Sequence, residues 1–555
     1  MMINLYIYFF FMFMMSILFY LLGLYLYYLE LSIMFEWLMF NFNSLNMEMM
    51  ILLDWIVCLF VSVVMLISSM IMLYSMIYMS QDVYINRFVN LLNLFIFSMI
   101  LMIMSPNLIS ILFGWDGLGL SSYCLVIYYQ NYISFNSGMV TVLCNRLGDV
   151  GLLMSISLVF MYGSWNMSFL LEYKGGLIML MILIAGLTKS AQIPFSVWLP
   201  LAMAAPTPVS ALVHSSTLVT AGVYLLFRFN SFLISFEVKN LLLYISVFTM
   251  FMAGLMANFE MDLKKIIALS TLSQLGLMMM VLSLGLKFLA FYHLLTHAVF
   301  KSLLFMCAGI MIHFMDNNQD IRFYGMLNEY IPFTMMSFYV SSLALMGFPF
   351  LSGFYSKDLI MEMIYMMNFN IFIISFIILS VMFTVSYSLR LIYYVFFSEF
   401  KWISLNNIKE NMLMNISMFV LLSLSIFGGA MFFWICFFDN YFIFISLSMK
   451  LLTLVFMMMG VLLVNLMYMK NLIQIYILTY FFSSMWMLNF LFLWIYKPFL
   501  NMGVKGFKMD MEWVEFIEKD LILKFMENIK LNLNQHSMYM YLFIIIMIFL
   551  IIFLM

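Results

Sequence analysis

The residues best able to do chemistry are ionisable side chains within long apolar stretches. His293, His297 and Lys301 follow one another at intervals of four, so on a helix they share one face over about 12 Å. Histidine and lysine can both exchange protons, so this alignment favours a proton route. A lone membrane histidine can instead cap a neighbouring carbonyl group, an interpretation that stays open for His313. Metal binding by the His-x-x-x-His pair is disfavoured, because no carboxylate or third ligand stands nearby in sequence.

Further ionisable residues interrupt other apolar stretches. Arg146 and Asp149 stand three residues apart, so a helix would pair them. Because arginine keeps its proton, this pair favours a supporting role.

Burial disfavours the charged form of a lysine such as Lys189 unless a carboxylate lies near. Asp116 could be that carboxylate, so that the pair acts as a proton switch; alternatively the two only neutralise each other. The other candidates for proton transfer are His214, Lys357 and Asp358.

These charges are expensive to bury. Each Asp, Lys or Arg at mid-bilayer costs about 2.5–3.5 kcal/mol, so seven unpaired charges would cost roughly 20 kcal/mol. A whole fold is stable by only about 5–15 kcal/mol. We therefore expect the charges to be paired with one another or hydrated by internal water, and either arrangement gives a polar track through the hydrocarbon. The seven residues are Asp116, Arg146, Asp149, Lys189, Lys301, Lys357 and Asp358.

The composition indicates the scaffold that must position these side chains. Of the 555 residues, 66% are hydrophobic and 9% are charged, whereas soluble domains are about 45–50% apolar and about 25% charged. The net charge of −2 and the lack of a basic run exclude disordered and nucleic-acid-binding classes. Because a bilayer core takes roughly 20 apolar residues per helix, the apolar runs predict an all-α polytopic membrane protein with about 16 transmembrane helices.

Prolines mark two places where membrane helices should break. Four of the eight prolines lie within fifteen residues, from Pro194 to Pro208, and Pro349 precedes a second polar segment. A break frees backbone carbonyls that must find protein or water partners, and paired breaks are typical of inverted-repeat transporters. One break follows Lys189 and the other precedes Lys357.

The ends of the chain differ from the apolar middle. The first 29 residues carry no charge, unlike a secretory signal or an Arg-rich transit peptide, so we expect a retained membrane helix. Residues 470–537 are rich in charge, and Trp513, Phe516 and Leu521 recur near helical spacing, which predicts an amphipathic helix against an interface or a partner. An ordinary charged loop is the alternative for this segment.

Two residue counts bear on origin and cofactors. The 64 methionines suggest a genetic code in which an isoleucine codon is read as methionine, as in animal mitochondria. The five cysteines form no CxxC or CxxxC pair, and no glycine-rich nucleotide motif is present. We therefore expect no iron–sulfur or nucleotide site in this chain.

Seven motifs together resemble the subunit 5 family of NADH–ubiquinone oxidoreductase, the antiporter-like subunits of respiratory complex I. The resemblance covers roughly residues 90–400, in order, while the flanks match mainly in hydropathy and length. The motifs are Phe113–Gly119, Asn145–Asp149, Lys189–Gln192 with Trp198–Pro200, Pro206–Thr217, Ser270–Gly276, His297–Lys301 and Gly353–Asp358.

The resemblance implies two inverted five-helix repeats, each with a broken helix, joined by a central polar axis. It implies that Asp116 is the essential acid and Lys189 its partner lysine, and that the hydrated relay runs through His214, His297, Lys301 and Lys357. The family commonly has Glu where this chain has Asp116. The shorter arm would then need a water or a small helix shift to reach Lys189.

The resemblance also implies a domain organisation. The expected parts are N-terminal transmembrane helices at 1–89, a first antiporter-like half at 90–260, a second half at 261–400, C-terminal transmembrane helices at 401–469, a lateral amphipathic segment at 470–537 and an anchor helix at 538–555.

The expected function is that of a proton-translocating subunit of complex I in the mitochondrial inner membrane, encoded in the mitochondrion. NADH, FMN, iron–sulfur clusters and ubiquinone would belong to other subunits, and no cofactor or metal to this chain. The expected partners are the other membrane-arm subunits, especially antiporter-like ones along the lateral helix, and membrane lipid, but not nucleic acid. Two rivals remain: a sodium/proton antiporter of the same ancestry, and a scaffold whose polar axis is inactive.

Overall fold

The computed structural model describes residues 2–42, 45–161, 163, 165–166, 176–235, 238–367, 370–399, 401, 410–436, 443–469, 476–532 and 538–554. The chain divides into two units, Met1–Trp486 and Met487–Met555. The domain boundaries expected at 400/401, 469/470 and 537/538 each touch a residue outside the described ones. The expected domain organisation stays a prediction.

Helices make up most of the first unit, which confirms the predicted all-α polytopic class. Within the described residues, twelve helices of the chain are long and apolar enough to cross a membrane. This number is below the predicted count of about 16, partly because α6, α14 and α15 have only 14, 15 and 15 residues. The long helices are α1 (Met2–Leu29), α2 (Trp55–Tyr78), α3 (Ile85–Met104), α4 (Leu108–Val126), α5 (Tyr132–Phe160), α11 (Val238–Ala257), α12 (Leu263–Ser283), α13 (Lys287–Phe314), α16 (Ile371–Ile392), α17 (Met412–Cys436) and α18 (Leu447–Met469). The twelfth span, Thr207–Arg228, is assembled from short segments.

The shorter elements fill the space between the long helices. They are α6 (Gly176–Lys189), α10 (Asn230–Ser235), α14 (Pro332–Met346), α15 (Ser352–Met366), α19 (Tyr476–Ser483), the 3-10 turns η5 (Ile321–Phe323) and η6 (Leu327–Glu329), and the π-helical turn η7 (Tyr393–Phe397) that extends α16.

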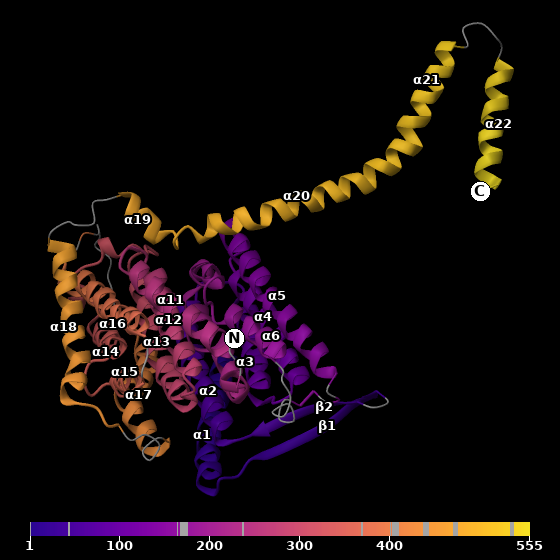
Figure 1. The fold of residues 1–555 in the computed structure, drawn as a ribbon. Helices are drawn as coiled ribbons and strands as arrows, with labels where there is room; N and C mark the ends of the chain where they lie inside the picture. The colour runs from indigo at the N-terminus through magenta and orange to yellow at the C-terminus, as the bar shows by residue number, and fades with distance from the viewer. Residues whose placement is uncertain are drawn as a thin grey trace. The chain divides into compact units, whose positions relative to one another are not determined.

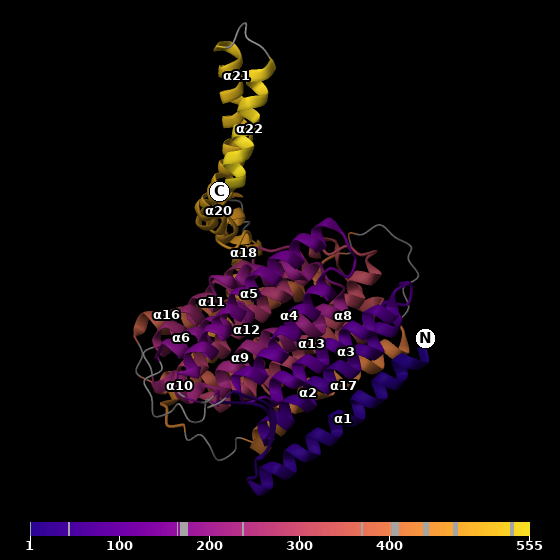
Figure 2. The same cartoon turned by 90° about the vertical axis from the view of Figure 1, so that its right-hand side faces the viewer.

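The core of the first unit is formed by α12 and α13. The most apolar windows of these two helices are 100% buried, whereas those of α1 and α18 are 17% buried. Both views place α13 inside the bundle and α1 at its margin (Figures 1 and 2). The histidine and lysine face of α13 therefore lies deep within protein, away from lipid.

The first predicted break follows Lys189. After α6 the chain makes the turns η2 (Phe195–Val197), α7 (Trp198–Leu201) and η3 (Ala202–Ala204), and then continues through α8 (Thr207–Val209), the π-helix η4 (Ser210–Thr217) and α9 (Leu218–Arg228). Proline lacks the N–H that continues a helix. The cluster of prolines therefore replaces one regular helix with several short segments.

The second predicted break lies between α14 and α15. Gly347 caps α14 in the left-handed region with φ 89°, a conformation that glycine adopts without strain. Pro349 and Leu351 then lead into α15, whose first residues are Ser352 and Gly353. Both interruptions therefore lie beside the lysines that the sequence singled out.

One β-hairpin was not predicted. Strands β1 (Ile33–Phe42) and β2 (Leu45–Leu53) pair antiparallel, with Ile33 opposite Leu53 and Trp37 opposite Met49. The apolar run that begins at residue 50 predicts one continuous helix to residue 79, but α2 begins only at Trp55. A short apolar run does not by itself distinguish a strand from a helix.

The second unit consists of helices. A long helix, α20 (Leu488–Glu515), continues through the π-helical turn η8 (Phe516–Leu521) into α21 (Ile522–Asn532), and α22 (Met538–Leu554) follows (Figure 1). Trp494 and Trp513 of α20 are 85% and 67% exposed. Within residues 476–532, the described part of the charged segment, the chain is mostly helical, and its place along neighbouring subunits stays a prediction.

Close packing of α5 on α6 depends on a glycine. A Cβ atom built on Gly148 would overlap the hydroxyl of Thr188, the residue before Lys189. Small residues let membrane helices approach closely. Gly148 therefore brings its neighbour Asp149 near the end of α6.

Replacing Gly148 with alanine should destabilise the chain by about 1–3 kcal/mol, because the added methyl group overpacks the α5–α6 contact. Gly119→Ala on α4 is the matched control, since a Cβ there meets no heavy atom within 4 Å. The midpoint of thermal unfolding of the purified complex would measure both. Equal midpoints for the two variants would contradict the packing argument.

Candidate functional site

The first cluster of charges lies where α4, α5 and α6 meet. Arg146 Nη1 lies 3.1 Å from Asp149 Oδ2 and 3.7 Å from Asp116 Oδ1. The Arg146–Asp149 pair predicted from the spacing of three is therefore formed, and Asp116 joins it. One guanidinium serves two carboxylates, so this triad keeps a net negative charge.

Lys189, the last residue of α6, is fully buried. Its Nζ donates to the backbone carbonyl of Trp115 at 2.7 Å and lies 4.1 Å from the centre of the Trp115 ring. Among the described residues, no ion pair joins Lys189 to Asp116. The direct pair suggested by the sequence is therefore not formed, because the amine contacts the carbonyl one residue earlier while the carboxylate points to Arg146.

Asp149 is the more buried of the two carboxylates that Arg146 contacts. The side chain of Asp149 is 12% exposed, against 40% for Asp116. Coulomb attraction is stronger away from water. A charge on Asp149 is therefore screened by water less than one on Asp116, although among the described residues no ion pair joins Asp149 to Lys189.

His214 lies on the π-helical segment η4 and is 1% exposed. Within the described part of the chain, neither of its ring nitrogens has a hydrogen-bond partner. The indole of Trp198 lies 6.2 Å away, and its Nε1 donates to the carbonyl of Thr188 at 2.9 Å. Trp198 therefore links the end of α6 to the segment that carries His214.

The second cluster is built on α13 with α12 and α15. His293, His297 and Lys301 are all fully buried. His293 Nδ1 lies 2.9 Å from Ser356 Oγ, and its Nε2 lies 3.2 Å from Gln274 Oε1. Because an amide oxygen only accepts, Nε2 donates to Gln274, while Nδ1 can accept from the Ser356 hydroxyl in the neutral ring or donate to it in the protonated ring. His293 is therefore positioned between a hydroxyl and an amide oxygen.

The next residues along this face have different environments. Lys301 Nζ donates to the hydroxyl of Ser270 on α12. The ring of His297 lies 6.2 Å from that of His293, and neither nitrogen of His297 has a partner among the residues described. Buried polar atoms are nearly always hydrogen-bonded, and water fills this need where protein does not.

Lys357 and Asp358 are neighbours in sequence but point to different helices. Lys357 Nζ donates to the carbonyl of Leu345 in α14, whereas Asp358 Oδ1 accepts from Thr453 of α18 at 3.3 Å. Both line a cavity of about 20 Å³, which suits a single water molecule. The two charges therefore do not form a direct pair in this arrangement.

Several polar residues of this region were missed by the sequence reasoning as separate candidates. Lys264 at the start of α12 is buried and donates to the carbonyl of Ala205 at 3.3 Å, beside the first break. Ser270 and Gln274 stand four apart on α12, and that spacing could have indicated that they share the face opposite α13. Tyr387 of α16, whose OH lies 3.4 Å from Ser273 Oγ, has no comparable signal.

The two clusters are connected through η4. This segment packs against both α12 and α13, so the segment that carries His214 contacts the two helices that hold His293, His297, Lys301 and Ser270. In the described part of the chain, no three His, Cys, Asp or Glu side chains are grouped as metal ligands. The expectation that the chain carries no metal or cofactor stays a prediction.

The class of protein follows from these features. A helical membrane bundle with two interrupted helices and a buried series of lysines and histidines is an antiporter-like membrane subunit. The family model described as NADH:quinone oxidoreductase/Mrp antiporter matches residues 105–384. Models described as NADH dehydrogenase subunit 5 C-terminus and as NADH-ubiquinone oxidoreductase (complex I), chain 5 N-terminus match residues 387–555 and 37–89.

Comparison with named protein chains identifies the family to which this chain belongs. NADH-ubiquinone oxidoreductase chain 5 of Anopheles gambiae is 47% identical over 94% of this chain and 92% of its own length. The same-named chain of Lumbricus terrestris is 44% identical over 79% of this chain and 77% of its own length. The chain belongs to the NADH-ubiquinone oxidoreductase chain 5 family.

Solved structures share the fold. A chain of the Mrp complex from Dietzia sp. DQ12-45-1b superposes with a TM-score of 0.76 at 22% identity, covering 89% of this chain and 57% of that one. A chain of the archaeal membrane-bound sulfane sulfur reductase gives 0.60 at 20% identity, over 69% of this chain and 80% of that one. The antiporter-like fold expected from the sequence is confirmed.

Water should occupy the positions beside His214 and His297. In a density map of the intact complex that resolves water, we expect a peak about 2.7–3.2 Å from at least one ring nitrogen of each histidine. His293 is the control, because both of its nitrogens already have protein partners. Dry nitrogens at both His214 and His297 would contradict a hydrated axis.

Proposed function

We propose that this chain moves protons across the mitochondrial inner membrane as an antiporter-like membrane-arm subunit of complex I. The proposed route runs from Lys189 through His214 to Lys301, His297 and His293, and ends at Lys357. The single observation that supports it most is that all six side chains are buried, at most 7% exposed, in one helical core.

The three lysines of this route are stabilised by dipoles rather than by counter-ions. Lys189 and Lys357 donate to backbone carbonyls, and Lys301 donates to a hydroxyl. Such partners can stay in place whether or not the amine carries an extra proton, since a neutral amine still donates. A lysine bound to a carboxylate would be trapped in its charged form. The observed partners therefore favour proton transfer over structural pairing.

The helix breaks supply two of the acceptors. Lys357 uses the carbonyl of Leu345 in the last turn of α14, and Lys264 uses that of Ala205 within the first break. A continuous helix satisfies its own carbonyls, whereas an interrupted one leaves some for side chains or water. The two breaks thus let amine groups sit within the apolar core.

The first cluster can act as the switch. Arg146 remains charged and competes with Lys189 for the two nearby carboxylates. When positive charge accumulates on the route, its repulsion moves the Lys189 amine toward Asp149. When that positive charge leaves the route, the amine returns to the Trp115 carbonyl. Moving each charge across the membrane costs about 2.3 kcal/mol per 100 mV. We infer that electron transfer in other subunits, which carry the redox cofactors, supplies this energy.

We also infer that α20 contacts neighbouring membrane-arm subunits.

Lys189→Ala and Lys301→Ala should each lower the number of protons pumped per NADH oxidised, because each removes a step of the route. Lys287→Ala is the matched control, since Lys287 is exposed at the start of α13. Proton uptake by proteoliposomes containing the assembled complex, together with the rate of NADH oxidation, would measure the ratio. Unchanged ratios in both variants would favour the scaffold interpretation, and a sodium requirement for transport would favour the antiporter alternative.

Asp149→Asn should impair pumping at least as much as Asp116→Asn, because Asp149 is the more buried carboxylate and its charge is screened less by water. Arg146 keeps Asp116 as a partner in Asp149→Asn, so assembly should be retained. The same pumping assay, with native gel electrophoresis for assembly, would compare the two variants. Normal pumping in an assembled Asp149→Asn complex would limit Asp149 to a structural role.

A further inference from the structure

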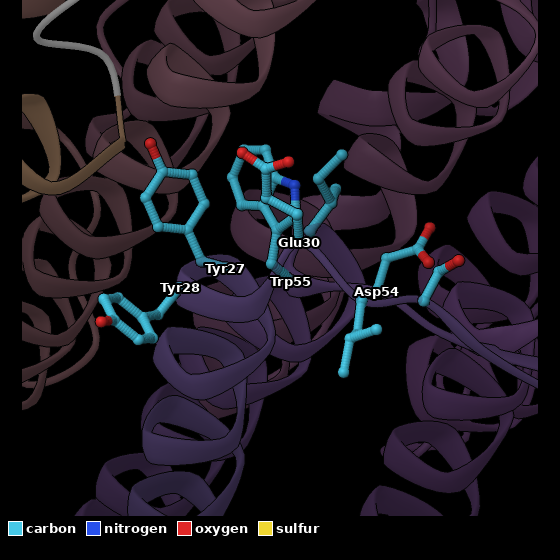
Figure 3. A pocket seen from close by; sticks show the side chains of 8 residues that line it. Tyr27, Tyr28, Glu30, Asp54 and Trp55 are labelled. Carbon is cyan, nitrogen blue, oxygen red and sulfur yellow. The ribbon is translucent and has the colours of Figure 1, made fainter.

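A hollow of about 680 Å³ lies outside the proton route, where α1 ends and α2 begins. It is lined by aromatic and acidic side chains, among them Tyr27, Tyr28, Glu30, Asp54 and Trp55. Figure 3 shows these five side chains where the end of α1 lies beside the start of α2. We propose that this hollow binds the choline headgroup of a membrane phospholipid.

The charge of the hollow favours a cation. Asp54 Oδ2 pairs with Arg228 Nη1 at 3.0 Å, and Arg228 Nε donates to Tyr224 Oη at 2.8 Å, so this carboxylate is already neutralised. Glu30 has no ion-pair partner among the described residues. One uncompensated carboxylate therefore remains at the hollow.

The aromatic side chains select an organic cation over a metal ion. Tyr27 and Trp55 meet edge to face with ring centres 5.3 Å apart. Trp55 in turn stacks on Phe288 at 6.1 Å and meets Phe291 at 6.4 Å, which positions the indole. Aromatic faces combined with a carboxylate recognise quaternary ammonium groups, whereas calcium takes six to eight oxygen ligands.

The hollow lies at the end of a 28-residue apolar helix that is long enough to cross the hydrocarbon, so the proposal places it at the depth of lipid headgroups. It opens at the last turn of α1, a 28-residue apolar helix, where Tyr25 and Tyr28 are 62% and 85% exposed. Tyrosine and tryptophan gather at the membrane–water interface. Along the helix away from the hollow, Leu18 and Leu21 are each 57% exposed, which provides an apolar surface for acyl chains.

The test uses the intact complex in nanodiscs with a trace of phosphatidylcholine that carries a photoreactive group in its choline headgroup. After irradiation, peptide mass spectrometry should find the label on residues 27–32 and 54–56. Glu30→Gln and Trp55→Leu should each reduce that labelling about fivefold, by removing the charge or the ring. Trp55→Phe and Glu30→Asp, which preserve each chemical feature, should retain it. Glu36→Gln on β1 is the matched control, since Glu36 is exposed and does not line the hollow.

Three outcomes would overturn the proposal. Equal labelling by a phosphatidylglycerol analogue with the same photoreactive group would mean that only surrounding bulk lipid is detected. Displacement of the label by millimolar free choline would assign the hollow to a soluble organic cation. Retained labelling in both Glu30→Gln and Trp55→Leu would remove the hollow from the binding site. Because the assay reads lipid binding, its result is independent of the proposed proton route.

Discussion

The structure depends on how charged side chains are accommodated within an apolar core. A buried amine or carboxylate needs a partner for every strong donor or acceptor, because the hydrocarbon offers none. The chain meets this need in two ways. At its surface it gathers opposite charges into a triad around Arg146, whose side chain is 48% exposed, and around the buried Lys189, Lys301 and Lys357 it uses carbonyl and hydroxyl oxygens. The first solution fixes charge in place, while the second leaves an amine able to exchange its proton.

The interruption of helices makes the second solution available. Regular helices use up their own carbonyls, so a bundle of uninterrupted spans would give Lys357 or Lys264 few internal acceptors. The prolines after α6 and α14 create irregular segments in the interior, and α12 and α13 surround them with protein rather than lipid. Irregular backbone at membrane depth survives only in such surroundings. The position of the polar axis at the core follows from that requirement.

The exposed parts of the two units meet different physical requirements from the buried core. The hairpin of β1 and β2 and the hollow at the end of α1 lie where the chain leaves the apolar layer, and they combine aromatic rings with carboxylates rather than lysines with carbonyls. The long helix α20 exposes both tryptophans and charged residues. These features suit the proposed contacts with lipid and other subunits, whereas the buried lysines and histidines suit the proposed proton transfer, so the proposals assign two separable roles to one chain.

Much of the candidate site could be predicted from sequence, because helical periodicity is local. The spacing of His293, His297 and Lys301 placed them on one face of α13, and the prolines located both breaks. The partners across helices could not be predicted in this way. Lys189 meets the Trp115 carbonyl, Asp358 meets Thr453, and Lys357 meets the Leu345 carbonyl. Ile33–Phe42 pairs with Leu45–Leu53 as strands. All of these contacts depend on which elements are neighbours. The sequence by itself determined which residues share a face and where helices must stop, since both depend on backbone geometry within one element. Only the tertiary structure decided which donor meets which acceptor, because that choice is made by the packing of segments far apart in the chain.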